Sequence, residues 1–372
     1  MTMLLIFTIG SIRVSAQELP EISAKYGVVY NPATGEVIFD KNAEAKAPMA
    51  STTKIMSALI VLQREDLDVP FVVDSEAIKT EGSSMGLREG DQVTLRALVC
   101  GMLLPSGNDA ANAAAVRVGG SVEGFVELMN RKASELGLEN THFVTPSGLD
   151  DYTDEHYSTA LDMAKLAAEA MKNDEFRRIC SKDKIKVCFG DPPYERWLTN
   201  TNKLLKMGSE YVGIKTGFTD KAKRCLVSAC DREKGELICV TLNAPDDWND
   251  HVKLYDYGYS KVSMTKIKPP ADSFCVSVVG GESERVLCGS KGFQVLLGDA
   301  CGSQVKARVF LPQFVYAPVK DSDVLGRIDY YYEGRLIGSR NIVSVQQVDK
   351  AKAQKDKSKA QGLFGKLMEL FG

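Results

Sequence analysis

Hydrophobic positions recur with different periods along the chain, and the period separates strands from helices. Short apolar runs at 26–30 and 36–40 flank the turn Asn31-Pro-Ala-Thr-Gly35, which predicts a β-hairpin. Apolar residues then recur at helical spacing over a long stretch of the chain. The predicted helices cover 52–65, 92–104, 108–118, 121–136 and 158–173.

A strand period returns in the next segment. Short β runs cover 211–219, 224–229 and 236–243, the last two joined by a turn at Gly235, and a helical pattern follows over 247–258. Strands at both ends of this part of the chain, with helices between them, predict one α+β domain. We expect its first and last strands to lie side by side in one sheet.

Beyond Lys268-Pro269-Pro270 the pattern is of the strand type only. Short runs between Gly-rich turns cover 276–279, 284–287, 292–297, 304–311 and 326–332. Strands at this spacing predict a small β-sandwich. We therefore expect an α+β domain over 17–265 and a β domain over 266–348.

The two ends of the chain carry different signals. Residues 3–9 are apolar and Val14-Ser15-Ala16 adds small residues, which predicts a secretory signal peptide over 1–16, with an apolar first strand as the alternative. Residues 349–372 predict a Lys-rich linker and an amphipathic helix, because the apolar side chains of 363–371 fall within an arc of about 160°. We expect export, with 363–371 on the outer surface of the cytoplasmic membrane; a helix docked on the protein itself is the alternative.

Composition argues against several classes of function. The chain of 372 residues carries 46 Lys and Arg against 49 Asp and Glu, so it has no overall basic character for nucleic acid. Three His and no Cys-x-x-Cys pair lead us to expect no metal and no cofactor. The nine Cys are expected to be mostly free, although Cys180 and Cys188, on either side of a predicted Lys-rich turn, could form a disulfide.

The motif Ser51-Thr-Thr-Lys54 opens the first predicted helix. Ser51 alone is consistent with a helix cap. Lys54 lies one turn later on the same face, and a Lys with a lowered pKa can take the proton of a Ser hydroxyl and so make it a nucleophile. The free N–H groups at a helix start can also stabilise an oxyanion. The motif therefore fits either a cap or a nucleophile with its base.

Two further motifs are equally ambiguous when taken singly. Ser106-Gly-Asn108 lies between two predicted helices, as a capping loop would, and Lys215-Thr-Gly217 lies in a β run, as an exposed edge strand would. Their order is more informative. Ser-x-x-Lys, then Ser-x-Asn about 55 residues later, then Lys-Thr-Gly about 109 residues further on, is the motif set of penicillin-recognising serine enzymes.

The residues around the motifs narrow the resemblance. Over nearly all of 21–348 the sequence resembles the low-molecular-weight penicillin-binding proteins, which are D-alanyl-D-alanine carboxypeptidases. The resemblance implies a β-lactamase/DD-peptidase-like α+β catalytic domain with an antiparallel sheet flanked by helices, followed by the β-sandwich and the amphipathic helix. The matching segments are Ala50-Ser-Thr-Thr-Lys-Ile-Met56, Leu103-Leu-Pro-Ser-Gly-Asn-Asp-Ala-Ala111, Thr141-His-Phe-Val-Thr-Pro-Ser-Gly-Leu149, His156-Tyr-Ser-Thr-Ala160, Asn200-Thr-Asn-Lys-Leu204 and Gly213-Ile-Lys-Thr-Gly-Phe-Thr219.

The resemblance also implies a catalytic role for four residues. Ser51 is the expected nucleophile, which forms an acyl-enzyme at the carbonyl between two D-alanines, and Lys54 is the expected general base. Ser106 is expected to relay a proton to the leaving D-alanine. Asn108 is expected to hydrogen-bond the backbone of the substrate.

The third motif is expected to bind substrate. The resemblance implies that Lys215 and Thr216 hold the terminal carboxylate, next to Gly217. The backbone N–H groups of Phe218 and Ser51 are expected to form the oxyanion hole. The expected partners are the peptidoglycan stem peptide, β-lactam antibiotics as covalent inhibitors and the membrane surface.

Two departures and two alternatives remain open. Ala222-Lys223-Arg224 stands where the family commonly has Ala-Gly, which leaves the local turn geometry open. Asp246-Asp247-Trp248-Asn249 stands where some relatives carry an Arg that assists carboxylate binding, so no residue is assigned to that role. A β-lactamase that deacylates through Glu169 is one alternative function, and a non-catalytic penicillin-sensing or wall-binding protein is the other.

Overall fold

The computed structural model describes residues 19–150, 153–233, 235–298 and 304–352, and the chain forms two compact units that meet in sequence at Val262 and Ser263. The signal peptide predicted over 1–16 and the amphipathic helix predicted over 363–371 lie outside the described residues. Within the described ranges, no helix is long and apolar enough to span a membrane.

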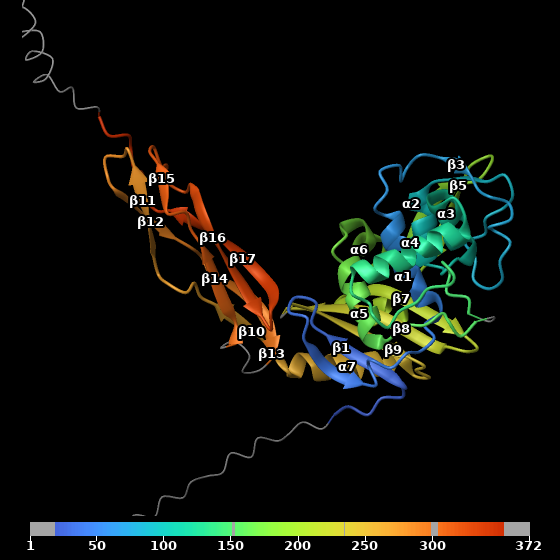
Figure 1. Cartoon of the computed structure of the whole chain (residues 1–372). Helices are drawn as coiled ribbons and strands as arrows, with labels where there is room; N and C mark the ends of the chain where they lie inside the picture. The colour runs from blue at the N-terminus through green and yellow to red at the C-terminus, as the bar shows by residue number, and fades with distance from the viewer. Residues whose placement is uncertain (1–18, 151–152, 234, 299–303, 353–372) are drawn as a thin grey trace, which may run out of the picture. The chain divides into compact units, whose positions relative to one another are not determined.

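The first unit is built around a five-stranded sheet in the order β2-β1-β9-β8-β7 (Figure 1). Each neighbouring pair is antiparallel. The first strand pairs with the last one, as the sequence predicts, and Val28 stands opposite Val240. The strands are β1 Tyr26–Tyr30, β2 Val37–Lys41, β7 Tyr211–Thr219, β8 Lys223–Arg232 and β9 Gly235–Leu242.

Helices cover both faces of this sheet. The last helix, α7, packs on one face, where Ser228 of β8 and Thr241 of β9 hydrogen-bond to its His251, and α5 packs on β1 and β9 from the other side (Figure 1). Every residue of α1 is buried: six of the eight are apolar, and the two polar ones, Lys54 and Ser57, each donate to a backbone oxygen. The helices are α1 Lys54–Val61, α2 Leu95–Leu103, α3 Asn108–Gly119, α4 Val122–Glu135, α5 Ala160–Ala170, α6 Asp174–Cys180 and α7 Asp247–Ser260.

Two small antiparallel strand pairs were not predicted. In one, β5 (Lys184–Phe189) pairs with β6 (Tyr194–Thr199). The predicted Lys-rich turn between Cys180 and Cys188 is therefore wrong for most of its length. Lysines alternate here with Ile185 and other apolar residues that turn inward, so the segment forms a strand with one charged face. The other is an antiparallel pair of two short strands, β3 (Phe71–Val72) and β4 (Gln92–Val93), joined by a long loop.

The second unit has no α-helix in its described part and is built mainly from strands. A six-stranded sheet runs in the order β14-β16-β17-β12-β11-β15, in which β11 and β15 are parallel, and β10 pairs with β13. Val286, Ile328 and Ile342 lie in its core. The strands are β10 Val262–Ile267, β11 Phe274–Val279, β12 Arg285–Gly289, β13 Phe293–Gly298, β14 Lys306–Phe310, β15 Phe314–Tyr316, β16 Val324–Tyr332 and β17 Arg335–Ser344.

The cysteines of the described part are all free thiols, Cys180 and Cys188 among them. The prediction of mostly free cysteines is confirmed for these eight. Six are buried, and burial raises the pKa of a thiol such as Cys225 to about 12, so it stays protonated and packs as a small apolar side chain.

Candidate active site

Ser51 and Lys54 face each other at the start of α1. A 3-10 turn, Ala50–Thr53, precedes the helix, and neither element has a side-chain cap at its N-terminus. The Ser51 hydroxyl therefore does not act as a cap. Its Oγ lies 2.8 Å from the Nζ atom of Lys54. Lys54 is the first residue of α1 and is completely buried.

The surroundings of Lys54 favour its neutral, basic form. Its Nζ donates to Asn108 Oδ1 at 2.7 Å and to the backbone oxygen of Ser147 at 2.6 Å, and both of these atoms can only accept. A neutral amine has two N–H bonds and one lone pair, so its lone pair remains for the Ser51 hydroxyl. Burial, followed by the charge of Lys215, lowers the pKa of Lys54 well below its usual value, although Asp109 opposes this.

The loop between α2 and α3 supplies Ser106 and Asn108. Ser106 adopts φ +67°, a left-handed conformation that is rare for residues other than glycine, and Gly107 N donates to Gly101 O at 2.8 Å. Asn108 donates from Nδ2 to Glu81 O at 2.7 Å while its Oδ1 accepts from Lys54. Asn108 therefore links Lys54 to the segment that contains Glu81.

Strand β7 brings the third motif against Ser51. The Lys215 side chain is buried and donates to Thr216 O at 2.7 Å, and burial lowers its pKa to about 7. Thr216 Oγ1 lies 2.6 Å from Thr201 Oγ1. A Cβ at Gly217 would lie 3.1 Å from Ser51 N, so glycine lets the strand pass this close to Ser51.

The three motifs meet at one cleft of about 420 Å³. Lys54 and Lys215 are buried behind it, and the sequence-predicted Ser51, Ser106 and Asn108 are among the residues on its wall. The full lining is Ser51, Gly82, Ser83, Ser106, Asn108, Gly148, Leu149, Thr201, Lys203, Thr216, Gly217, Phe218, Thr219, Arg224, Asp247 and Trp248.

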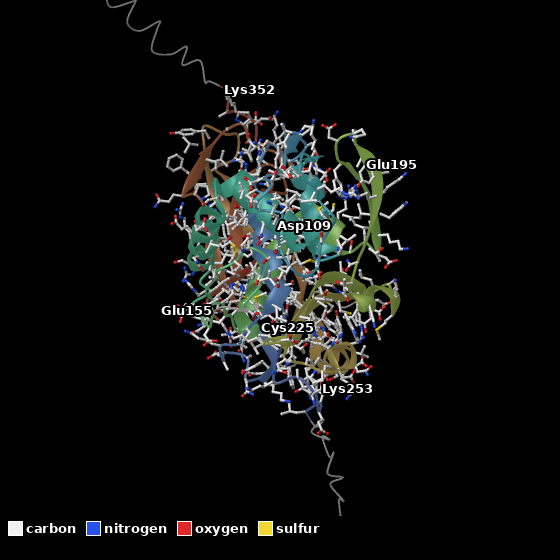
Figure 2. The ribbon with its side chains drawn as sticks, turned by 90° about the vertical axis from the view of Figure 1, so that its right-hand side faces the viewer. Asp109, Glu155, Glu195, Cys225, Lys253 and Lys352 are labelled. Carbon is white, nitrogen blue, oxygen red and sulfur yellow. The ribbon has the colours of Figure 1, made fainter. Side chains whose placement is uncertain are left out.

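Asp109 is a supporting residue that the sequence did not reveal. It lies in the middle of the first unit (Figure 2), where Oδ1 accepts from Met85 N at 2.9 Å and Oδ2 accepts from the Ser84 hydroxyl at 2.6 Å. These bonds hold the segment that contributes Gly82 and Ser83 to the cleft. From sequence alone, an Asp in the first turn of a helix is explained by the helix dipole.

Ser147 acts through its backbone oxygen, so its side chain gave no signal. The only sequence sign is the neighbouring Gly148, which adopts φ +88°. A Cβ there would lie 2.0 Å from Ala50 O. Glycine therefore allows this loop to pack against Ala50, and the Ser147 oxygen accepts from Lys54 Nζ.

Arg224 and Asp247 form a charged pair on the cleft wall. Arg224 stands opposite Phe218 in the β7–β8 ladder, and it donates to Asp247 Oδ1 from Nε at 3.1 Å and from Nη2 at 2.6 Å. The preceding Lys223 has φ +58°, so the turn does adopt a left-handed conformation where the family commonly has glycine. None of the sequence motifs contains Arg224.

Glu169, the carboxylate of the β-lactamase alternative, lies on α5 and pairs with Lys172 at 2.6 Å. It is not among the residues that line the cleft. Among the described lining residues, Asp247 is the one carboxylate, and it is bound to Arg224. Nor do three or more His, Cys, Asp or Glu gather anywhere in the described ranges in a way that could hold a metal ion.

Comparison with known proteins agrees with this geometry. The family model for D-alanyl-D-alanine carboxypeptidases matches residues 13–246. The chain belongs to this family. It is a serine-type D-alanyl-D-alanine carboxypeptidase, as the motifs predicted, and its helix-flanked antiparallel sheet followed by a β-rich unit is the predicted fold class.

The curated relatives cover most of the chain. D-alanyl-D-alanine carboxypeptidase DacF of Bacillus subtilis is 30% identical over 352 residues, which is 88% of this chain and 86% of the relative. DacC of Escherichia coli is 32% identical over 371 residues, which is 95% of this chain and 88% of the relative.

Solved structures of similar fold include penicillin binding protein 5 from Haemophilus influenzae, at a TM-score of 0.65 and 27% identity, covering 90% of this chain and 100% of that one. A Streptomyces DD-transpeptidase matches at a TM-score of 0.62 and 33% identity, covering 66% of this chain and 100% of that one.

Proposed function

We propose that this carboxypeptidase removes the terminal D-alanine of peptidoglycan pentapeptide stems through an acyl-enzyme on Ser51. The observation that carries the proposal is the contact of 2.8 Å between Ser51 Oγ and the buried Lys54 Nζ, at the wall of an open cleft. The other two hydrogen-bonding positions of Nζ are occupied by acceptors, which directs the lone pair of Lys54 at the Ser51 hydroxyl.

Acylation begins when Lys54 takes the hydroxyl proton of Ser51. The Ser51 oxygen attacks the carbonyl carbon between the two D-alanines, and the carbonyl oxygen becomes an oxyanion. The backbone N–H groups of Ser51 and Phe218 stabilise this charge. Gly217 supports the proposed oxyanion hole, because it brings β7 close to Ser51 N.

The departing D-alanine needs a proton on its nitrogen. Ser106, on the same cleft wall, passes a proton from the Lys54 ammonium to that nitrogen as the C–N bond breaks. Asn108 holds Lys54 in place and offers its second N–H to the backbone of the stem peptide. Lys215 and Thr216 bind the terminal carboxylate of the substrate.

Water completes the cycle. Lys54, again neutral after the proton has left with D-alanine, takes a proton from a water molecule that attacks the acyl ester on Ser51. The Lys54 ammonium returns this proton to Ser51 Oγ as the ester bond breaks, and the shortened stem leaves. Water therefore supplies the proton that restores the Ser51 hydroxyl.

β-Lactam antibiotics are proposed to acylate the same Ser51. Their ring amide presents a carbonyl to the nucleophile, and their carboxylate resembles the C-terminus of the stem. The acyl ester should persist, because the amine released from the opened ring stays attached to the acyl group in the cleft. In addition, Glu169 is not among the residues that line the cleft, and Asp247 is bound to Arg224. This persistence is the property that distinguishes the carboxypeptidase from a β-lactamase.

We expect Ser51→Ala to abolish both labelling by fluorescent penicillin and release of D-alanine from a pentapeptide stem mimic. Ser57→Ala is the matched control on the same helix, because its hydroxyl is buried and donates to Pro146 O instead of facing the cleft. The control should keep both activities. Covalent label on a Ser51→Ala protein, at Ser106 or elsewhere, would show that the nucleophile is wrongly assigned.

We also propose that the enzyme is exported and held on the outer face of the cytoplasmic membrane by 363–371. The sequence places apolar side chains on one face of this segment and lysines before it. Full burial of six large apolar side chains is worth of order 10 kcal/mol, which is an upper limit for an interface. Lysines at 350, 352, 355, 357 and 359 add attraction to anionic lipid.

Truncation after Val348 should release the enzyme from anionic vesicles while leaving hydrolysis of a soluble peptide unchanged. Leu367→Glu should largely reproduce the release, because it puts a charge into the apolar face of the segment. Leu336→Glu, at a half-exposed position of β17, is the control and should bind as the unaltered protein does. If the full-length and truncated proteins sediment equally with vesicles, the membrane proposal fails.

A further inference from the structure

The Arg224 side chain belongs to the same cleft as Ser51, although none of the motifs contains it. It comes from β8 at the position directly across from Phe218, whose backbone N–H is assigned to the oxyanion hole. The ladder therefore places the base of this side chain one strand away from the reacting carbonyl. Arg224, Thr216 and Phe218 all line the cleft.

The guanidinium group of Arg224 is held in a fixed orientation. Nε and Nη2 both donate to Asp247 Oδ1, and Arg224 Cζ lies 5.3 Å from the centre of the Trp248 ring. Asp247 is itself almost completely buried, and Oδ1 also accepts from Trp248 N at 2.9 Å. An anchored and stacked arginine loses little side-chain entropy when it binds an anion.

Part of the guanidinium group remains available to a ligand. Nη1 carries two N–H donors and has no hydrogen-bond partner in the part of the chain that the structure describes. The Arg224 side chain is 40% exposed, whereas that of Asp247 is 3% exposed. The pair therefore presents arginine donors, and not carboxylate oxygens, to the cleft.

The two buried lysines behind the cleft do not by themselves supply a permanent positive charge for the carboxylate of the substrate. Lys54 is the neutral base, and the Lys215 ammonium is buried and already donates to Thr216 O. Because burial lowers the pKa of Lys215 to about 7, only part of the empty enzyme carries this charge near neutral pH. Arginine stays protonated throughout, so Arg224 brings a permanent and anchored positive charge to the cleft wall, where Lys203 is the other cationic side chain of the described lining.

We propose that Arg224 binds the terminal carboxylate of the stem peptide and is the residue that makes the enzyme select substrates with a free C-terminal carboxylate. Asp247 and Trp248 are positioning residues that aim its Nη1. The inference rests on the proposed function and deepens it. It predicts a binding effect confined to substrates that carry the carboxylate, because an amide offers no negative charge to Arg224.

The test compares two soluble peptides, diacetyl-lysyl-D-alanyl-D-alanine and the same peptide with a C-terminal amide. The unaltered enzyme should hydrolyse the acid with the higher kcat/KM. Arg224→Met should raise KM for the acid at least tenfold, change kcat by less than about threefold, and leave kcat/KM for the amide nearly unchanged. A raised KM with a nearly unchanged kcat is expected when the lost interaction stabilises the bound substrate and the transition state equally.

Two conservative variants and one control sharpen the test. Arg224→Lys should restore part of the preference for the acid, because it returns the charge without the fork of donors. Asp247→Asn should raise KM for the acid less than Arg224→Met does, because the guanidinium group remains but loses its anchor. Arg232→Met is the matched control on the same strand, since Arg232 also pairs with an aspartate, Asp256, and stacks on an aromatic ring.

The possible outcomes distinguish a wrong role for Arg224 from a wrong assignment of the carboxypeptidase function. Equal losses of the acid and amide activities, or an unchanged preference for the acid in Arg224→Met and Arg224→Lys, would overturn the role of Arg224 and leave the carboxypeptidase assignment standing. If the unaltered enzyme releases D-alanine from no such peptide, the proposed function fails and this inference fails with it. If Arg224→Met does not fold, the ratio of acid to amide turnover in Arg224→Lys and Asp247→Asn decides, because both retain a polar side chain in place.

Discussion

Two serines of the first unit each contact a nitrogen base, yet only one of them is at the cleft. Ser51 Oγ lies 2.8 Å from Lys54 Nζ, and Ser228 Oγ lies 2.7 Å from His251 Nδ1. Burial is the main cause of a lowered pKa at both bases, and for His251 it lowers the pKa to about 3. Both pairs therefore combine a hydroxyl with a base whose neutral form is favoured by burial, at hydrogen-bonding distance.

The pairs differ in what else they touch. Ser228 and His251 lie between β8 and α7 with no exposed surface, and the remaining ring nitrogen of His251 lies 3.0 Å from Thr241 Oγ1. Ser51 is partly exposed and lines a cleft, next to strand β7. A serine with its base is therefore insufficient for catalysis, and access for a carbonyl together with nearby N–H donors makes the difference.

The largest expected effect comes from substitutions of Lys54, the proposed base of the pair that lies at the cleft. Lys54→Arg should slow acylation by penicillin almost as much as Lys54→Ala, by roughly 10⁴-fold, because a guanidinium group does not give up its proton to act as a base. Lys215→Arg should slow acylation less, since the proposed role of Lys215 needs only a positive charge near the carboxylate. Stopped-flow labelling with fluorescent penicillin measures all three rates. Comparable losses from both Arg substitutions would contradict this division of roles.

The next effect concerns the stability of the enclosed pair. Burial lowers the pKa of His251 to about 3 and that of His156 to about 4, so below pH 6.5 the unfolded chain binds protons that the folded protein does not. The free energy of unfolding should therefore fall as the pH drops from 6.5 to 4, by about 3 kcal/mol for each histidine at pH 4. Above pH 6.5 neither histidine contributes to the pH dependence.

Urea unfolding at a series of pH values measures this change. His251→Gln should remove its share of the slope between pH 6.5 and 4, even if the variant is less stable at neutral pH. His156→Gln should in the same way remove the share of His156, so the two variants separate the contributions of the two buried histidines. A slope that is the same in the unaltered protein and in His251→Gln would refute the buried neutral state of His251.

The smallest expected effect removes the hydroxyl of the enclosed pair. Ser228→Ala should lower the free energy of unfolding by about 1–2 kcal/mol, because it leaves His251 and Tyr255 each without one hydrogen-bond partner. Release of D-alanine should stay unchanged. A variant that keeps its stability but loses activity would show that Ser228 takes part in the reaction and that the comparison between the two serines is wrong.

Much of the fold could be predicted because its signals are local. The helix starts at Thr94, Ser121 and Thr159 are marked by side chains that accept from backbone N–H groups three residues later. Strand β17 was missed because its apolar Leu336 and Ile337 are consecutive and are followed by polar residues, so no alternation is visible. Its place in the sheet comes from pairing with β16.

In the site, too, residues that act through distant contacts or through the backbone could not be predicted from the sequence. The order of three motifs was sufficient to predict Ser51, Lys54 and Lys215, because their chemistry resides in side chains. Ser147 contributes a backbone oxygen, which any residue would supply. Arg224 meets Asp247 only because β8 and α7 pack together, and residues 23 positions apart in the sequence give no local sign of such a contact.

The free cysteines offer a practical route to the motions of this enzyme. Of those described, Cys188 and Cys275 are the exposed ones, on β5 of the first unit and β11 of the second. Once Cys301, outside the described residues, is replaced by serine, maleimide dyes should attach selectively at these two positions. Energy transfer between the dyes would then follow any reorientation of one unit against the other during turnover, without a new labelling site having to be introduced.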